Sequence, residues 1–114
     1  MKAQSRRSAK RIEAGRHPSL PGLVNFTTDE VEGSGSILNI SAGGAAIDNA
    51  TTVLAVGTKV ELFFLQPETE RKLRAVAEVL RNSRAGFAVR FLRVERELEK
   101  LVLRAARDSE RKKS

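Results

Sequence analysis

A basic run near the start of the chain has the residue types needed to bind an anion. It reads Arg6-Arg7-Ser8-Ala9-Lys10-Arg11, with Arg7 and Arg11 four residues apart. Residues 1–17 hold six basic side chains and one acidic side chain, and residues 104–114 hold five and two, so the ends carry +5 and +3; the middle carries −1, which gives the net +7. This distribution favours an anionic partner met by terminal segments. Taken alone, such a run is most often a solvated tail.

A second polar cluster reads Asn39-Ile40-Ser41-Ala42-Gly43-Gly44 and follows an apolar stretch. If this stretch is a strand, alternation puts Asn39 and Ser41 on one face, with Leu38 and Ile40 on the other. We expect Leu38 and Ile40 to fill a core, so Asn39 and Ser41 point outward. Ile37 shares the outward face in this scheme, so the alternation is imperfect.

The glycine pair that ends this cluster offers a second kind of contact. Without side chains, Gly43 and Gly44 can adopt positive φ and let a ligand approach their backbone N–H groups. Polar residues followed by two glycines are also ordinary turn chemistry between strands. On its own, the cluster leaves both interpretations open.

The elements that must position these residues are short strands and one helix. Runs rich in Val, Ile, Leu and Phe, bounded by Gly, Asn, Asp and Ser, predict strands at 22–28, 31–41, 44–48, 58–66, 71–82 and 85–92. Apolar residues at Leu98, Leu101, Val102 and Ala105 have helical spacing and predict an amphipathic helix over about 93–111. The fold class is therefore mainly β, a six-stranded antiparallel β-barrel with a C-terminal α-helix covering one opening.

The chain divides into three segments in this scheme. Residues 1–21 are polar and interrupted by Gly15, Pro18 and Pro21, so we expect a flexible basic arm without regular structure. Residues 22–110 form the barrel and its helix, and 111–114 are a tail. The length of 114 residues suits one domain.

Composition argues against several classes of function. The chain has one histidine, no cysteine, and no aromatic residue other than five phenylalanines, so we expect no enzyme, no cofactor and no metal site. His17 lies before Pro18 without a companion ligand. No apolar stretch approaches the roughly 20 residues of a membrane span, and the basic N-terminus lacks the apolar core of a secretory signal. We therefore expect a cytoplasmic protein.

Together, the two clusters give the chain a resemblance to the PilZ domain family, bacterial receptors for cyclic di-GMP. Arg7 and Arg11 match the family's RxxxR motif, and Asn39, Ser41 and Gly44 match (D/N)xSxxG. The order of the motifs, their separation, the strands that follow and a GxxxRF-like ending at 86–91 also fit. The resemblance covers about residues 6–107.

The resemblance implies a role for each motif residue. Arg7 and Arg11 would clamp the bases and phosphates of cyclic di-GMP, since a guanidinium meets guanine O6 and N7 or a phosphate bidentately. Asn39 would bind a guanine edge and Ser41 would add a hydroxyl contact. Gly43 and Gly44 would allow close approach.

The family also implies a relay mechanism. The arm would fold across the barrel when ligand binds, and its new position would signal to a downstream protein partner that the sequence does not identify. Family members with an arginine at the position of Arg6 tend to bind a stacked ligand dimer, so we expect two ligands per protomer.

Two alternatives stay open. A small basic barrel could bind nucleic acid non-specifically, although the chain has few aromatic side chains on which bases could stack. A degenerate PilZ-fold protein could act purely as a protein-interaction adaptor that does not bind the nucleotide. No residue chooses among motility, exopolysaccharide production, development and virulence as the output.

Overall fold

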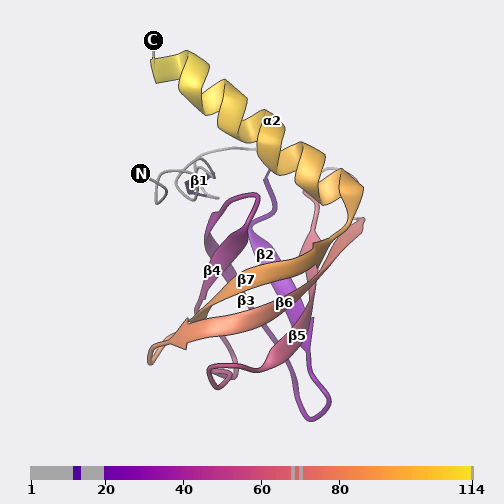
Figure 1. The fold of residues 1–114 in the computed structure, drawn as a ribbon, viewed down its shortest axis with the longest axis vertical. Coiled ribbons are helices and arrows are strands. Elements are labelled where there is room, and N and C mark those ends of the chain that lie inside the picture. The colour runs from indigo at the N-terminus through magenta and orange to yellow at the C-terminus, as the bar shows by residue number, and fades with distance from the viewer. Residues whose placement is uncertain (1–11, 14–19, 68, 70, 114) are drawn as a thin grey trace.

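The computed structural model describes residues 12–13, 20–67, 69 and 71–113. Most of this part is β-strand, followed by one helix (Figure 1). The elements are β1 (Ile12–Glu13), β2 (Leu23–Thr27), β3 (Glu32–Ile40), β4 (Gly44–Asp48), β5 (Lys59–Leu65), β6 (Lys72–Asn82), β7 (Phe87–Val94) and α2 (Arg96–Lys113).

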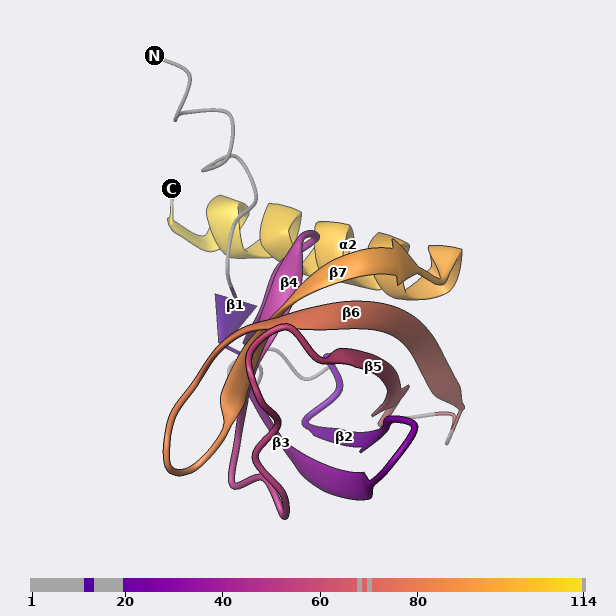
Figure 2. The ribbon, with the colours of Figure 1, turned by 60° about the horizontal axis from the view of Figure 1, so that its bottom comes forward.

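Six of these strands close into an antiparallel barrel. Hydrogen-bonded neighbours follow the order β3, β2, β5, β6, β7 and β4, and β4 pairs back with β3. Figure 2 shows this ring of strands with α2 lying beside it. The predicted six-stranded barrel with a C-terminal helix is confirmed. The short strand β1, which was not predicted, adds to the Ile40 end of β3.

Alternating side chains from all six strands fill the barrel. In β5, Val60, Leu62 and Phe64 are buried, whereas Phe63 lies on the outer face and is only half-buried. Phe26 of β2 and Phe87 of β7 meet edge to face across the interior, with ring centroids 5.2 Å apart. This apolar interior is the main stabilising element of the fold, since buried apolar area dominates folding free energy.

Three β-bulges interrupt the alternation, and each inserts a leucine. The register skips Leu38 between β3 and β4, Leu80 between β6 and β7, and Leu92 on the opposite strand of that same pair. All three leucines are about half exposed. A bulge adds one residue to one strand and so shifts the phase of every side chain beyond it.

The first bulge corrects the predicted orientation of β3. Ile37 is buried and Leu38 is exposed, the reverse of the simple alternation, and the extra residue returns Ile40 to the core. The prediction that Leu38 points inward is therefore wrong, because strict alternation was carried across a position where the strand bulges.

Helix α2 lies across one end of the barrel. Leu98, Leu101, Val102 and Ala105 are buried and join the barrel core, which confirms the predicted apolar stripe. The helix packs against β1 and β6. Glu97 and Glu99 in its first turn suit the positive end of the helix dipole. In the described part of the chain, no helix has the length and apolar character needed to cross a bilayer.

Candidate functional site

The second motif forms the turn that joins β3 to β4, at the end of the barrel nearest α2 (Figure 1). Asn39 lies near the end of β3, and Gly44 begins β4. The turn is held from both sides: the Ser41 N–H donates to the Gly44 carbonyl at 2.8 Å, and the Phe91 N–H of β7 donates to the Gly43 carbonyl at 2.8 Å. The motif is therefore a fixed platform attached to the sheet.

Ser41 is buried within this turn, with 4% of its surface exposed. Its Oγ accepts a hydrogen bond from the Gly43 N–H at 3.2 Å and lies 3.4 Å from the Gly44 carbonyl, to which it donates. The expectation that Ser41 points outward beside Asn39 is wrong, because the strand ends at Ile40 and the chain turns inward at Ser41. Its hydroxyl therefore stabilises the turn through these two hydrogen bonds.

The two glycines of the motif have different surroundings. A Cβ added to Gly44 would lie 2.2 Å from the carbonyl oxygen of Val89, so β4 can approach β7 there only without a side chain. A Cβ added to Gly43 would meet nothing within 4 Å, and Gly43 is exposed. In the described residues, positive φ occurs at Asn49 and Gly57, so neither motif glycine uses that freedom. Gly44 serves strand packing, and Gly43 leaves one open stretch of backbone.

Asn39 lies between two strands at the edge of this platform. It pairs with Ala46 of β4 on one side and with Glu13 of β1 on the other. Its side chain is partly exposed. The next pair is Ile12 with Ile40, and both of these side chains are buried in the core.

Strand β1, which lies beside the second motif, is the structural feature that the sequence prediction missed. The segment 1–21 was expected to lack regular structure, yet Ile12–Glu13 pairs with the motif strand. The available signal was Ile12 itself, an isolated β-branched residue in a polar stretch. Two residues are too few to show a periodic pattern.

The predicted ligand-binding arginines Arg6, Arg7 and Arg11 lie outside the described residues, as do Arg16 and His17. Arg90 is a further cation near the second motif. It lies opposite Gly44 in β7, and its guanidinium contacts a Glu78 carboxylate oxygen at 2.6 Å on the solvent-exposed surface. Within the described ranges, no three His, Asp or Glu side chains come together as a metal site.

Comparison with known proteins gives one family and two related folds. The PilZ domain family model matches residues 5–107, a span that includes both motifs. The inhibitor of motility MotI/DgrA of Bacillus subtilis superposes with a TM-score of 0.71 at 21% identity. That match covers 95% of this chain but 53% of MotI/DgrA, so the chain spans about half of that protein.

The second solved structure is the PilZ domain of CeSA from a cellulose-synthesizing bacterium. It superposes with a TM-score of 0.61 at 19% identity, covering 90% of this chain and 99% of that domain. A search of curated protein sequences found no match. Both superpositions show the same fold, and the family model covers nearly the whole chain. On these grounds, the chain belongs to the PilZ domain family.

Proposed function

We propose that this chain is a non-enzymatic receptor that binds cyclic di-GMP and relays its level to a partner protein. The family match over both motifs supports the ligand. The structural observation that most directly supports the proposed site is the pairing of β1 with β3. Arg11 is joined by one peptide bond to Ile12, and Ile12–Glu13 pairs with Ile40 and Asn39. The RxxxR motif therefore ends one residue before a strand that pairs with the second motif, which supports a site shared by the two motifs.

The proposed roles follow from the donors that each residue offers. Arg7 and Arg11 bind bases and phosphates through bidentate, charge-assisted hydrogen bonds. Asn39 both donates and accepts, which suits a guanine edge. Exposed Gly43 admits close approach of the ligand to the backbone, whereas Ser41 and Gly44 act by holding the turn in shape.

The proposed relay is the ordering of residues 1–11 over the barrel when ligand binds. Its driving force is the new arginine contacts, which offset the entropy lost by the ordered chain. The similarity to an inhibitor of motility and to the PilZ domain of CeSA from a cellulose-synthesizing bacterium supports motility and exopolysaccharide production as the outputs to examine first.

The deciding experiment is a calorimetric titration of cyclic di-GMP into the purified protein, with GMP and cyclic AMP as controls. We expect saturable heat for cyclic di-GMP alone. If Arg6 supports a stacked ligand dimer, the stoichiometry is two and falls to one in Arg6→Leu. Absence of heat, together with unchanged amide signals at saturating ligand, would refute the receptor proposal and favour the adaptor alternative.

Variants test the assignment of the arginines. Arg7→Ala and Arg11→Ala should each abolish measurable binding and leave the thermal midpoint of the free protein nearly unchanged. Arg84→Ala is the matched control, because Arg84 is exposed in the turn between β6 and β7. Affinity that is unaltered in both Arg7→Ala and Arg11→Ala would remove these residues from the site.

Salt dependence separates this proposal from non-specific nucleic-acid binding. A polymer that contacts many phosphates loses orders of magnitude in affinity between low and moderate salt. A dinucleotide with two charges should lose far less. A steep salt dependence with duplex DNA, without binding of cyclic di-GMP, would favour the basic-barrel alternative.

A further inference from the structure

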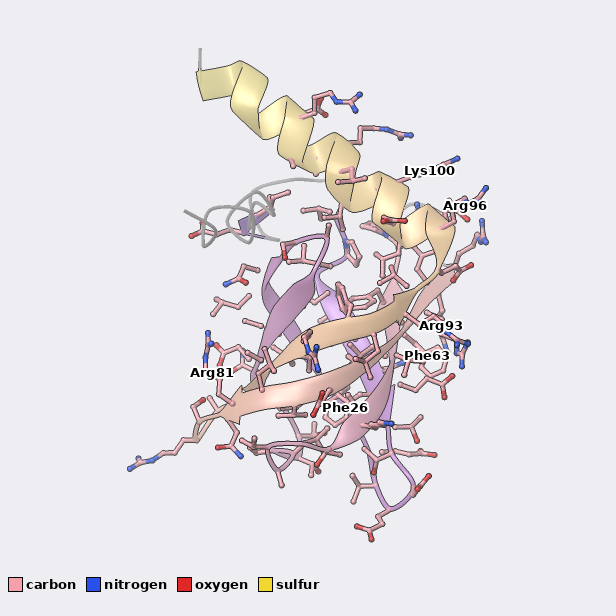
Figure 3. All side chains as sticks on the ribbon, in the orientation of Figure 1. Phe26, Phe63, Arg81, Arg93, Arg96 and Lys100 are labelled. Carbon is pink, nitrogen blue, oxygen red and sulfur yellow. The ribbon has the colours of Figure 1, made fainter. Side chains whose placement is uncertain are left out.

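The exposed face of α2 carries four cations in line, Arg96, Lys100, Arg104 and Arg107, which we call the basic stripe. At about 100° per residue, they fall within about 80° of one another on the helix. The buried residues of α2 centre about 150° away, on the side that packs against the barrel. Figure 3 shows Arg96 and Lys100 extending away from the sheet.

These cations differ from three arginines of the barrel, Arg71, Arg74 and Arg90, in having no carboxylate partner among the described residues. On the barrel, Arg71 contacts Glu97 at 2.8 Å, Arg90 contacts Glu78 and Arg74 contacts Glu61. No residue of the basic stripe forms an ion pair with a described carboxylate. The stripe therefore presents uncompensated positive charge over about 17 Å of helix.

Arg96 is also unfavourably placed for the stability of the helix. It is the first residue of α2, where the positive end of the helix dipole favours acidic side chains. A cation at that position opposes the dipole and has no ion pair to compensate for it. Its placement is better explained by an anionic partner than by helix stability.

A hollow of about 480 Å³ borders the first part of the stripe. Gln66, Glu95, Arg96, Glu97, Lys100, Leu101 and Arg104 line it. Both carboxylates of the hollow are engaged: Glu95 accepts a hydrogen bond from the Arg74 N–H at 2.9 Å, and Glu97 pairs with Arg71. The three cations of the hollow remain available to a partner.

We propose that the basic stripe and this hollow dock an acidic segment of a partner protein; this inference rests on the proposed relay function and names its partner surface. The Glu95 carboxylate, whose donor is a neutral backbone N–H, would repel a continuous row of phosphates or lipid headgroups. Spaced carboxylates on a protein helix avoid that repulsion. Exposed Leu103 beside the stripe offers an apolar contact between the charges.

The test uses a synthetic helical peptide with glutamates at every fourth residue and a leucine beside them. Its control is a peptide of the same composition in scrambled order. Fluorescence anisotropy should show binding of the aligned peptide about tenfold tighter than that of the scrambled peptide. The charge reversal R96E/K100E/R104E should remove this preference. The matched variant K59E/R81E/R84E, which changes the same number of exposed charges on the barrel, should retain it.

Two further measurements make the outcome decisive. Equal binding of both peptides, or equal loss in both triple variants, would overturn the proposal as non-specific attraction. Stripe-dependent binding of phosphatidylglycerol vesicles or duplex DNA without binding of the aligned peptide would also overturn it. Calorimetry with cyclic di-GMP should be unchanged in R96E/K100E/R104E, so failure of the docking surface is distinguishable from failure of the receptor proposal.

Discussion

The strand pairs β4–β7 and β5–β6 hold the same barrel together by opposite means. In β4–β7 the backbones approach closely over small residues: an added Cβ would lie 2.2 Å from the Val89 oxygen at Gly44 and 1.8 Å from the Ile47 oxygen at Gly86. These two glycines lie near the two ends of the paired segment. Strands β4 and β7 can therefore pair this closely only because Gly44 and Gly86 have no side chains.

In β5–β6, large apolar side chains provide the cohesion. Leu62 and Phe64 face the core from β5, Leu73 and Val79 face it from β6, and each is at most 1% exposed. Seven consecutive residue pairs connect the strands without a bulge. Such a pair tolerates added volume poorly, but its main vulnerability is loss of volume.

The difference indicates which kinds of substitution each strand pair tolerates. The second motif ends on β4 at Gly44, in the strand pair that is limited by steric space, whereas most of the stabilising apolar burial lies elsewhere in the barrel. Substitutions that enlarge residues should therefore disturb the site, and substitutions that shrink residues should disturb the fold. The predictions below test this contrast.

The largest expected effect is at Phe64. Phe64→Ala removes a fully buried ring that packs edge to face against Phe91, with centroids 6.1 Å apart. It should lower the free energy of unfolding by about 3–5 kcal/mol in urea denaturation. Phe63→Ala, on the outer face of the same strand, should cost much less. Equal losses would mean that burial in β5 does not stabilise the barrel.

The next effect is at Gly44. Gly44→Ala should lower the free energy of unfolding by about 1–3 kcal/mol, because its methyl group would collide with the Val89 carbonyl. The same variant should weaken cyclic di-GMP binding by shifting the turn. Gly43→Ala has open space and should stay within about 0.5 kcal/mol of the wild type. A destabilised Gly43→Ala with a neutral Gly44→Ala would reverse our assignment of the two glycines.

Ser41→Ala tests the turn itself. It removes the hydroxyl that accepts from the Gly43 N–H and donates to the Gly44 carbonyl, at a cost of about 1 kcal/mol in stability. Because the backbone bond from Ser41 to Gly44 remains, cyclic di-GMP affinity should fall less than in the arginine variants. Ser83→Ala, exposed in the turn after β6, is the control. A complete loss of binding in a stable Ser41→Ala protein would instead mean direct contact with the ligand.

The smallest effect is expected at the surface ion pairs of the barrel. Arg74→Ala breaks the pair with Glu61 and should change the free energy of unfolding by less than about 1 kcal/mol. The coupling energy from the cycle of Arg74→Ala, Glu61→Ala and the double variant should shrink at high salt. A coupling of several kcal/mol would show that the β5–β6 pair depends on charge as well as on apolar burial.

The strands were predictable because their pattern is strong and repeated. The predicted span 58–66 became β5 at Lys59–Leu65, and 44–48 matched β4 directly. The helix predicted at 93–111 is Arg96–Lys113, displaced by two or three residues at each end. Alternation and helical periodicity report which face is buried, and this barrel has one clear interior.

The site geometry was less predictable because it depends on local breaks in that pattern. The bulge at Leu38 reversed the face of Ile37, and no rule of alternation locates a bulge. The sequence locates the second motif, but it does not show that Ser41 stabilises the turn or that Gly44 allows β4 to approach β7. Their neighbours, the Gly43 N–H and the Val89 carbonyl, are set by the turn and by a strand distant in sequence.

In the proposed receptor, the pairing of Ile12 with Ile40 affects the rate of ligand capture. Arg11 and Asn39 are 28 positions apart in the sequence, and a free chain of that length closes a loop at an entropic cost that grows with the logarithm of its length. Ile12, 6% exposed in the core, closes that loop before any ligand arrives. In the proposed receptor, Arg11 is one peptide bond from this pair, so the length of the connection between β1 and β2 can vary without slowing ligand binding.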